Sequence, residues 1–367
     1  MRPSHRGNDP GGVGRWDRFL QCRYTEAILQ VQTFHTSDAF DALKPEWNAL
    51  LKQSASDALF LTWEFQATWW RHLRDGDDLR LITVRDADGG LIGIAPVYGL
   101  RTDGDCIALR LIGGVEVADY LDFIAARGCE REVLRAIFEA LCAMPDWRLL
   151  DLRNVPAASP TRALLPALAA ERGFAVEERV EEVCPVVALP ETFDAYLDSL
   201  DKKQRHEIRR KIRKAHNEAA VSWHVVGAEH DLTTAMNDFI DLHQRSAHYK
   251  DDFMTPDMQN YFRALAQQMQ SAGWLELAFI EIHGTRAASY FNFVYNDETL
   301  CYNSGYDPEA YAVLSPGIVL LSTLIDHSIQ QKRKRFDFLQ GNEVYKYRMG
   351  AADTQVYQLT VQRPSQS

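Results

Sequence analysis

The stretch that most constrains the fold of this chain spans residues 299–348, where two strand-like segments flank one helical segment. Thr299–Tyr306 is the first strand, Ser315-Pro316-Gly317 opens the helix, and Arg335–Leu339 is the second strand. Ser is a favoured N-cap residue, and Pro at the first helical position loses no useful hydrogen bond. A helix that starts at the end of a strand presents unpaired N–H groups and a positive dipole end. The order therefore predicts a binding site for a phosphate-bearing cofactor at residues 315–317.

A dense polar cluster follows the second strand. Its members are Asp337, Glu343, Tyr345, Lys346 and Arg348. Residues at the end of a sheet strand commonly face a ligand crevice. In a functional interpretation, a carboxylate accepts a proton, the tyrosine protonates a leaving group and the lysine neutralises an anion. The competing interpretation is a solvated helix start, with Glu343 near its N-terminus and the cations paired to it.

The order of elements in this stretch is repeated, more weakly, in the first half of the chain. In both halves, strands joined by a short turn lead into a further strand, a helix and one more strand. The first-half strands and helix lie at 79–86, 91–100, 108–112, 130–144 and 147–155, and their second-half counterparts at 275–282, 287–295, 299–306, after 315 and 335–339. Asp151 and Asp337 occupy corresponding places. This order predicts mixed sheets with helices on their faces.

Length and composition limit the remaining alternatives. A chain of 367 residues exceeds the usual size of one domain. The net charge of −11 argues against nucleic acid or an anionic membrane as the main partner. The six cysteines form no CxxC pair or Cys/His cluster, which argues against a metal site and fits free thiols in a reducing cytoplasm. We expect residues 1–28 to be a disordered tail, and we expect no membrane insertion.

Several short motifs, each present once, follow one another along residues 32–362. They are Gly93-Ile94-Ala95-Pro96, Ala118-Asp119-Tyr120-Leu121-Asp122, Lys203-x-Arg205, Leu242-His243 with Arg245, Ser315-Pro316-Gly317, and Asp337-x-x-x-Gly341-x-Glu343-x-Tyr345-Lys346. With these marks the chain resembles the tandem-GNAT acyltransferases of the bacterial cellulose-biosynthesis (CelD/BcsL) acetyltransferase type, which are related to the Fem-type aminoacyltransferases.

The resemblance implies an α/β fold with two GNAT-like domains, each a mixed, mostly antiparallel sheet flanked by helices. We place the domains at residues 29–185 and 186–367. The first half lacks counterparts of the Ser315 and Glu343 motifs, so we expect it to be catalytically silent and to form one wall of a cleft. The second half departs from typical GNAT enzymes, because the loop at 307–317 has one glycine and no basic residue where Q/R-x-x-G-x-G/A is usual.

The resemblance also assigns roles to residues. It implies acetyl-CoA or another acyl-CoA as co-substrate, with no metal. The cofactor-binding candidates are Tyr306, Ser315, Pro316 and Gly317, and the catalytic candidates are Asp337, Glu343, Tyr345 and Lys346. The substrate-binding candidates are Arg205, Arg209, His243, Asn303, Asp119 and Tyr120. The competing interpretation of the basic run at 202–214 is a solvated helix face. The competing interpretation of His243 is a core or capping residue.

The predicted function is the transfer of an acyl group from acyl-CoA to an amine or hydroxyl of a small molecule, sugar or cell-envelope precursor. One alternative is a Fem-like transferase that takes its aminoacyl group from tRNA, held by the basic run. Another is a non-catalytic GNAT-fold scaffold in a polysaccharide-synthesis complex. The acceptor, the acyl group, the general base and the oligomeric state are left open.

Overall fold

The computed structural model describes residues 29–74, 76–101 and 107–364. The predicted tail at 1–28 lies outside these residues. The first half contains β1 (Gln30–Phe34), α1 (Asp38–Lys52), α2 (Trp63–Trp69), β2 (Asp78–Leu79), β3 (Leu81–Arg85), β4 (Leu91–Ala95), β5 (Val97–Arg101), β6 (Ile107–Leu111), β7 (Ile124–Ala125), α3 (Glu130–Ala143), β8 (Trp147–Pro156), α4 (Pro160–Glu171) and β9 (Ala175–Ala188).

The second half begins with helices, continues with strands and ends with a strand that the sequence analysis does not predict, β15. Its elements are α5 (Phe193–Ser199), α6 (Lys202–Glu218), β10 (Val221–Val225), α7 (Leu232–Ser246), α8 (His248–Phe253), α9 (Pro256–Ser271), β11 (Leu275–Ile282), β12 (Thr285–Tyr295), β13 (Glu298–Tyr306), a 3-10 helix (Ala312–Leu314), α10 (Pro316–Gln330), β14 (Arg335–Asp337), α11 (Val344–Arg348) and β15 (Ala352–Gln362). Side chains of Thr192, Asp201, Asp231 and Thr255 cap α5, α6, α7 and α9.

The predicted mixed α/β fold is confirmed, and the repeated element order is visible in strand pairing. In the first half β5 and β6 are antiparallel and β6 is parallel to β8. In the second half β11, β12 and β13 are antiparallel and β13 is parallel to β14. Each parallel pair is joined by a helical crossover, α3 or α10, as parallel strands require.

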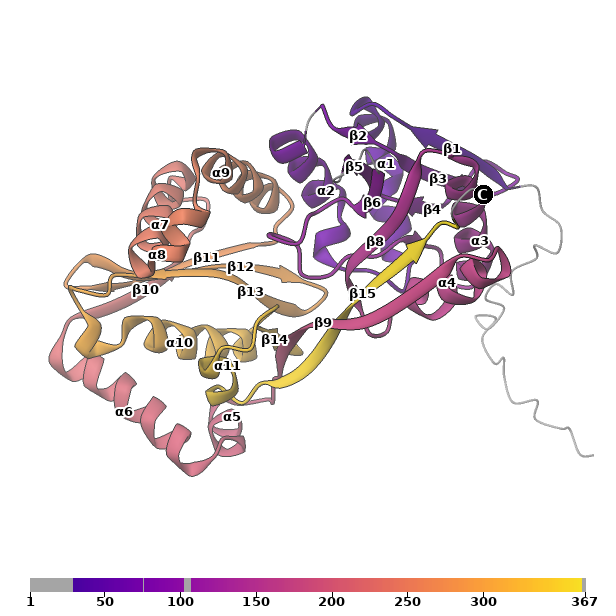
Figure 1. The fold of residues 1–367 in the computed structure, drawn as a ribbon. Coiled ribbons are helices and arrows are strands. Elements are labelled where there is room, and N and C mark those ends of the chain that lie inside the picture. The colour runs from indigo at the N-terminus through magenta and orange to yellow at the C-terminus, as the bar shows by residue number, and fades with distance from the viewer. Residues whose placement is uncertain (1–28, 75, 102–106, 365–367) are drawn as a thin grey trace, which may run out of the picture.

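The two halves share one sheet, which the sequence did not predict. Its order is β10-β11-β12-β13-β14-β9-β15-β8-β6-β5-β2, beside a smaller sheet β1-β3-β4-β7. The last strand, β15, lies between β8 and β9, so the C-terminal segment completes the sheet of the first half (Figure 1). The expected domain junction at 185/186 falls within β9, whose Val186–Ala188 pair with β14.

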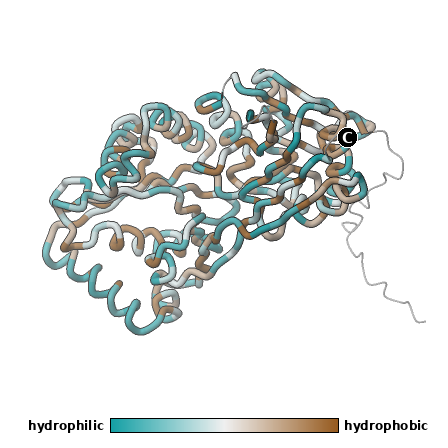
Figure 2. Tube along the Cα trace, in the orientation of Figure 1, coloured by the Kyte–Doolittle hydropathy of each residue, from teal (hydrophilic) through white to brown (hydrophobic). Residues whose placement is uncertain are grey.

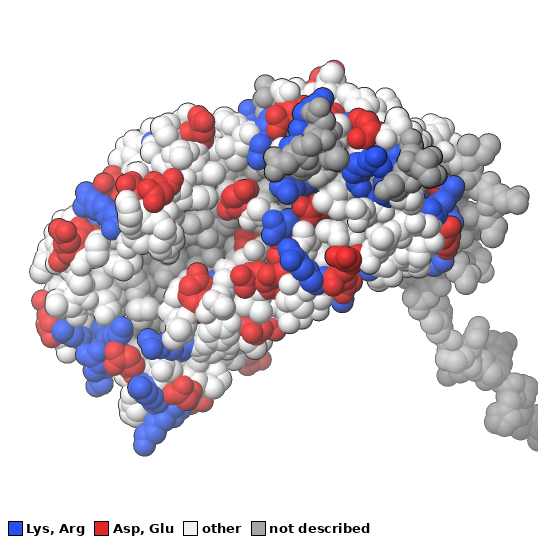
Figure 3. Space-filling view, viewed as in Figure 1, with Lys and Arg blue, Asp and Glu red and all other residues white. Residues whose placement is uncertain are grey.

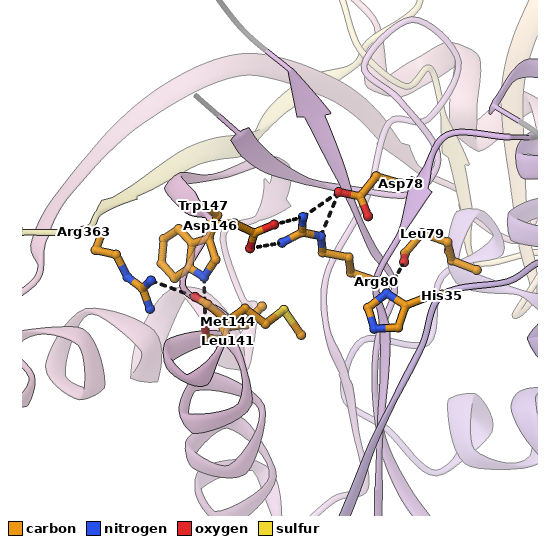
Figure 4. Close-up of polar contacts among 9 residues, drawn as sticks. All are labelled: His35, Asp78, Leu79, Arg80, Leu141, Met144, Asp146, Trp147 and Arg363. Atoms are coloured by element: carbon orange, nitrogen blue, oxygen red, sulfur yellow. Dashed lines mark hydrogen bonds and ion pairs between the residues drawn. The ribbon is translucent and has the colours of Figure 1, made fainter. Parts of the chain in front are cut away.

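The end of the chain is also fastened to the first half by side chains. The guanidinium of Arg363 donates to the carbonyl of Met144 (2.7 Å) and stacks on the Trp147 ring (Figure 4). It also donates to the carbonyl of Cys142 at the end of α3. Nearby, the buried Arg80 bridges Asp78 and Asp146, which joins β2 to the turn before β8 (Figure 4). The two halves therefore form one interlocked body rather than two independently closed sheets.

The second-half sheet is covered on both faces. Helices α7 and α9 pack on one face, whereas α10 packs on the other and is itself covered by α5 and α6 (Figure 1). The segment Ala312–Gln330, which includes α10, is the one helix of the described residues that is apolar and long enough to span a membrane. Its apolar side chains pack into the core of the second half. By contrast, α6 is hydrophilic along most of its length (Figure 2).

Candidate active site

A cavity of about 990 Å³ opens where β13 and β14 separate. Their pairing ends at Leu300 and Asp337, and the residues that follow on β13 and in the loop after β14 line the cavity. The helix start Ser315–Gly317, the loop 338–340, helix α8 and the first-half loop 115–119 complete its walls. Figure 3 shows the molecule hollowed between the two helical layers of the second half. The cavity thus lies on the carboxyl side of a parallel strand pair, where a ligand crevice is expected.

The helix start at Ser315 has a different geometry from a standard N-cap. Ser315 is left-handed (φ 52°), and its side chain makes no capping hydrogen bond. Pro316 has no N–H, and the N–H groups of Ile318 and Val319 both donate to the Ser315 carbonyl. The backbone N–H of Gly317 and the Ser315 hydroxyl are therefore the groups that this helix start can offer to a ligand in the cavity.

The positive charge that the 307–317 loop lacks comes from helix α6. Lys211 lines the cavity together with Ala312 and Ser315. Three residues further along, the Lys214 ammonium donates to the Val313 carbonyl (3.1 Å), which holds α6 against this loop. The sequence does not distinguish Lys211 from the other cations of the basic run, because only the packing of α6 shows which of them faces inward.

Arg205 and Arg209, the predicted substrate contacts of this helix, do not line the cavity. Arg205 donates to Asp198 (2.8 Å) and Arg209 to Asp194 (3.4 Å), both on α5. These ion pairs fasten α6 to the preceding helix. Their positions agree with the solvated-face interpretation of this side of α6.

Two contacts join the first-half loop to the polar cluster. The Tyr120 hydroxyl donates to Asp337 (2.8 Å), and the Asp119 carboxylate accepts from the backbone N–H of Gln340 (3.0 Å). The Gln340 side chain donates back to the Asp119 carbonyl (3.2 Å). Asp119 lines the cavity, whereas Asp337 lies beneath it. Burial raises the pKa of Asp119 to about 6, against the opposing effects of the Gln340 N–H and Lys346.

Asp337 is 5% exposed, and burial raises its pKa to about 7, even though the Leu339 N–H and the Tyr120 hydroxyl stabilise its charged form. A buried carboxyl with a raised pKa binds its proton more tightly when folded. Its charged form therefore destabilises the fold increasingly as pH rises from about 4 to 7.

Asp337→Asn should remove this penalty. Between pH 5 and pH 8 the free energy of unfolding of the wild type should fall by about 2 kcal/mol relative to that of the variant. Urea unfolding at several pH values measures the difference. Asp307→Asn serves as a control, because backbone N–H groups of Ala310 and Glu309 lower the pKa of Asp307, so it is ionised throughout this range. Parallel wild-type and Asp337→Asn curves would contradict the assignment.

Lys346 is 2% exposed, and its ammonium has four oxygen neighbours. It donates to the carbonyls of Leu339 (3.2 Å), Gln340 (2.5 Å) and Gly341 (3.1 Å) and lies 2.9 Å from the Glu343 carboxylate. Leu339 and Gly341 both have positive φ, so the loop is sharply bent around the ammonium. Lys346 therefore holds the loop that presents Gln340 to Asp119, and its three donors are already used.

His243, Asn303 and Lys250 form a third group on the cavity wall. The His243 Nε2–H donates to the Asn303 side-chain oxygen (3.1 Å), and His243 Nδ1 is buried without a partner. Burial, with the nearby Lys250 charge, lowers the pKa of His243 to about 4, so this ring is neutral at physiological pH. Gly305 allows α7 to lie close enough to β13 for His243 to reach Asn303, because a Cβ at position 305 would lie 2.4 Å from the His243 backbone nitrogen.

Lys250 was not predicted from the sequence. Its ammonium donates to the Ser304 carbonyl (2.6 Å) and lines the cavity, and burial lowers its pKa. The remaining predicted residues Tyr306, Tyr345 and Glu343 also line the cavity, as do Ser315, Pro316 and Gly317. Tyr120 does not line it and acts through Asp337. No residue type or spacing in the sequence marked Lys250, because α8 reaches the cavity only through its packing on α7 and β13.

Comparison with known proteins supports the fold and the second-half domain. Residues 202–347 match the model of the acetyltransferase (GNAT) domain family. No curated protein sequence matches the chain. The fold is similar to the crystal structure of FemX, at a TM-score of 0.63 and 12% identity, covering 89% of this chain and 96% of FemX.

Two further structures share this fold. A conserved protein of unknown function from Bacteroides thetaiotaomicron has a TM-score of 0.56 and 15% identity, covering 91% of this chain and 100% of that one. The C-terminal domain of a putative lysylphosphatidylglycerol synthetase from Agrobacterium fabrum has a TM-score of 0.54 and 11% identity, covering 88% and 92%. Residues 202–347 are therefore similar to the acetyltransferase (GNAT) domain family, and 89% of the chain shares its fold with FemX.

Proposed function

We propose that this protein is an acyltransferase that moves an acyl group from acyl-CoA to an amine or hydroxyl of a small-molecule or cell-envelope acceptor in the cytoplasm. The observation that carries the proposal is the continuous cavity from the Ser315–Gly317 helix start to Asp119. One end offers N–H, hydroxyl and ammonium groups to a phosphate, and the other offers a carboxylate to an acceptor. The assignment of residues 202–347 to the GNAT acetyltransferase domain supports the chemistry.

The donor end is assigned to Ser315, Gly317 and Lys211. The pyrophosphate of CoA would accept from the Gly317 N–H and the Ser315 hydroxyl, and the Lys211 ammonium would supply a charge-assisted hydrogen bond. In this arrangement α6 replaces the basic residue and the extra glycines of the usual loop. The acyl group would lie toward Cys301 and Phe338, in the gap between β13 and β14.

The chemical step follows from the groups at the other end. The acceptor nitrogen or oxygen forms a bond to the acyl carbon, and its proton passes to Asp119, which has a pKa near neutrality and faces the cavity. The carbon–sulfur bond then breaks, and Tyr345 can donate its hydroxyl proton to the leaving thiolate. Asp119 thereby takes the role that the sequence assigned to Asp337 or Glu343.

Lys211→Gln should weaken acetyl-CoA binding by about ten- to a hundredfold, because a charge-assisted hydrogen bond contributes roughly 1.5–3 kcal/mol. Arg213→Gln, an exposed change on the same helix, should leave the affinity unchanged. Isothermal titration with acetyl-CoA, and with desulfo-CoA to avoid turnover, measures both. Equal affinity of the two variants would contradict the role of Lys211, and failure of every CoA species to bind would overturn the proposed donor.

A transferase that takes an aminoacyl group from tRNA is the second candidate. The cationic outer face of α6 and the single free N–H at the helix start favour it, and FemX has the same fold. Titration with bulk tRNA separates the two donors, because phosphate contacts make RNA affinity fall steeply with salt. If neither CoA nor tRNA binds, a non-catalytic scaffold in a polysaccharide-synthesis complex becomes the better explanation.

A further inference from the structure

The outer face of α6 and the rim of the cavity form a surface that the proposed reaction does not use. Eight of the residues in 202–214 are Lys or Arg, and one is acidic. Lys211 turns inward, whereas five of these cations are exposed to solvent: Lys202, Lys203, Arg209, Arg210 and Arg213. We call these five residues the α6 cation stripe. Figure 3 shows a dense group of basic side chains beside the hollow, at the position of α6.

Local ion pairs neutralise only part of the stripe. Arg210 pairs with Glu207 (2.8 Å), and Arg209 contacts Asp194 at 3.4 Å. Among the described residues, Lys202, Lys203 and Arg213 have no carboxylate within ion-pair distance. The whole chain carries a net charge of −11, so the stripe is a local reversal of sign. Such a distribution orients the molecule, because an anionic surface attracts this side and repels the rest.

Exposed apolar side chains lie around the cavity, to which α6 contributes Lys211. Of the eight large hydrophobic residues that are exposed in the described chain, three lie on the rim: Tyr249 (70% exposed), Tyr306 (41%) and Val313 (72%). Tyr249 and Tyr306 line the cavity, and Val313 follows the lining residue Ala312. Lys214 holds Val313 against α6 through its carbonyl. Apolar residues that cluster at a cavity mouth mark an interaction surface rather than ordinary scatter.

We propose that the α6 cation stripe and this apolar rim dock the protein on an anionic phospholipid bilayer, with the cavity mouth facing the membrane. Cations and aliphatic or aromatic tips on one surface match the interfacial region of a bilayer, where lipid phosphates meet hydrocarbon. The phosphates of an RNA duplex would also pair with the cations, but a duplex presents no apolar surface for the exposed Val313 side chain. The acceptor that fits this arrangement is the head group of an amphiphile, which reaches the cavity without leaving the bilayer.

Vesicle flotation tests the docking independently of acyl transfer. The wild type should bind vesicles of phosphatidylglycerol and phosphatidylcholine, should bind pure phosphatidylcholine vesicles at least about tenfold more weakly, and should dissociate as salt is raised. The paired substitution Lys203→Glu with Arg213→Glu should weaken binding by about tenfold or more. The matched pair Arg131→Glu with Arg148→Glu changes the net charge equally at exposed sites in the first half and should bind as the wild type does.

The apolar contribution is tested by Val313→Asp against Val180→Asp. Val180 is exposed on β9, away from the rim, so only the Val313 change should weaken binding to the anionic vesicles. Equal binding to both vesicle types, or vesicle binding unaffected by the α6 pair, would overturn the proposal. The proposal would also be overturned if the wild type did not bind vesicles but bound bulk tRNA, and if the α6 pair of substitutions weakened that tRNA binding. Acetyl-CoA titration of each variant separately reports whether the proposed donor site is intact.

Discussion

Replacing Lys346 with methionine should lower the free energy of unfolding by about 3 kcal/mol and nearly abolish acyl transfer. The methylene stem of the side chain can still pack, but the carbonyls of Leu339, Gln340 and Gly341 lose their shared donor. Each buried carbonyl left without a partner costs roughly 1–3 kcal/mol. The loop that presents Gln340 to Asp119 would then relax, so activity should fall together with stability.

Arg348→Met provides the matched control, because Arg348 is an exposed cation on the same short helix. It should change neither the urea midpoint nor turnover appreciably. Measuring unfolding and single-turnover acyl transfer for both variants separates a structural from a chemical role. A Lys346→Met protein that keeps its stability and loses only turnover would show that the ammonium acts on the substrate and not on the loop.

Asp119→Asn should lower turnover by about 10²- to 10³-fold while leaving acetyl-CoA affinity unchanged. The asparagine oxygen can still accept from the Gln340 N–H, so the loop contact is preserved. What is lost is the group that accepts the proton of the acceptor. Since the pKa of Asp119 is about 6, wild-type kcat/KM should fall tenfold per pH unit well below pH 6, where the carboxyl is protonated.

The residual activity of Asp119→Asn should lack this acidic limb. Glu116→Gln is the matched control, because Glu116 is an exposed carboxylate that lines the same cavity on the same loop. Its pH profile should follow that of the wild type. If the Asn variant kept the acidic limb near pH 6, another group, with Asp337 the first to examine, would be the proton acceptor.

Both predictions depend on the first half of the chain, whose role is to build the cavity. Its loop supplies Asp119 and Tyr120, and the Val117 carbonyl accepts from the Tyr302 hydroxyl (2.7 Å). Three hydrogen-bonded contacts thus span the two halves within a few residues of the proposed chemistry. The proposal keeps the expectation that the first half forms one wall of a cleft, because its loop lines the cavity. It departs from the expectation of a catalytically silent first half, because that loop carries Asp119, the proposed proton acceptor.

Strong local signals in the sequence predict the secondary structure around the cavity. The strand, helix and strand of 299–339 form as predicted, because alternating apolar residues, a Pro at the first helical position and an apolar helix agree at short range. The site candidates Ser315, Gly317, Asn303 and Tyr345 all line the cavity. The roles of individual residues are harder to predict from the sequence than the elements that carry them. Lys346 and Asp337, for example, are both buried and contact neighbouring protein groups.

The sequence alone determined the class of fold, because periodicity and element order are encoded locally, and several residues that it predicts for the site line the cavity. Only the tertiary structure decided which charged groups can meet a ligand. The packing of α6 on α10 turns Lys211 inward and leaves Arg205 and Arg209 bound to α5. The insertion of β15 between β8 and β9 holds the halves together, so that Asp119 meets Gln340 across 221 residues of chain. Such contacts depend on burial and long-range register, which no local pattern records.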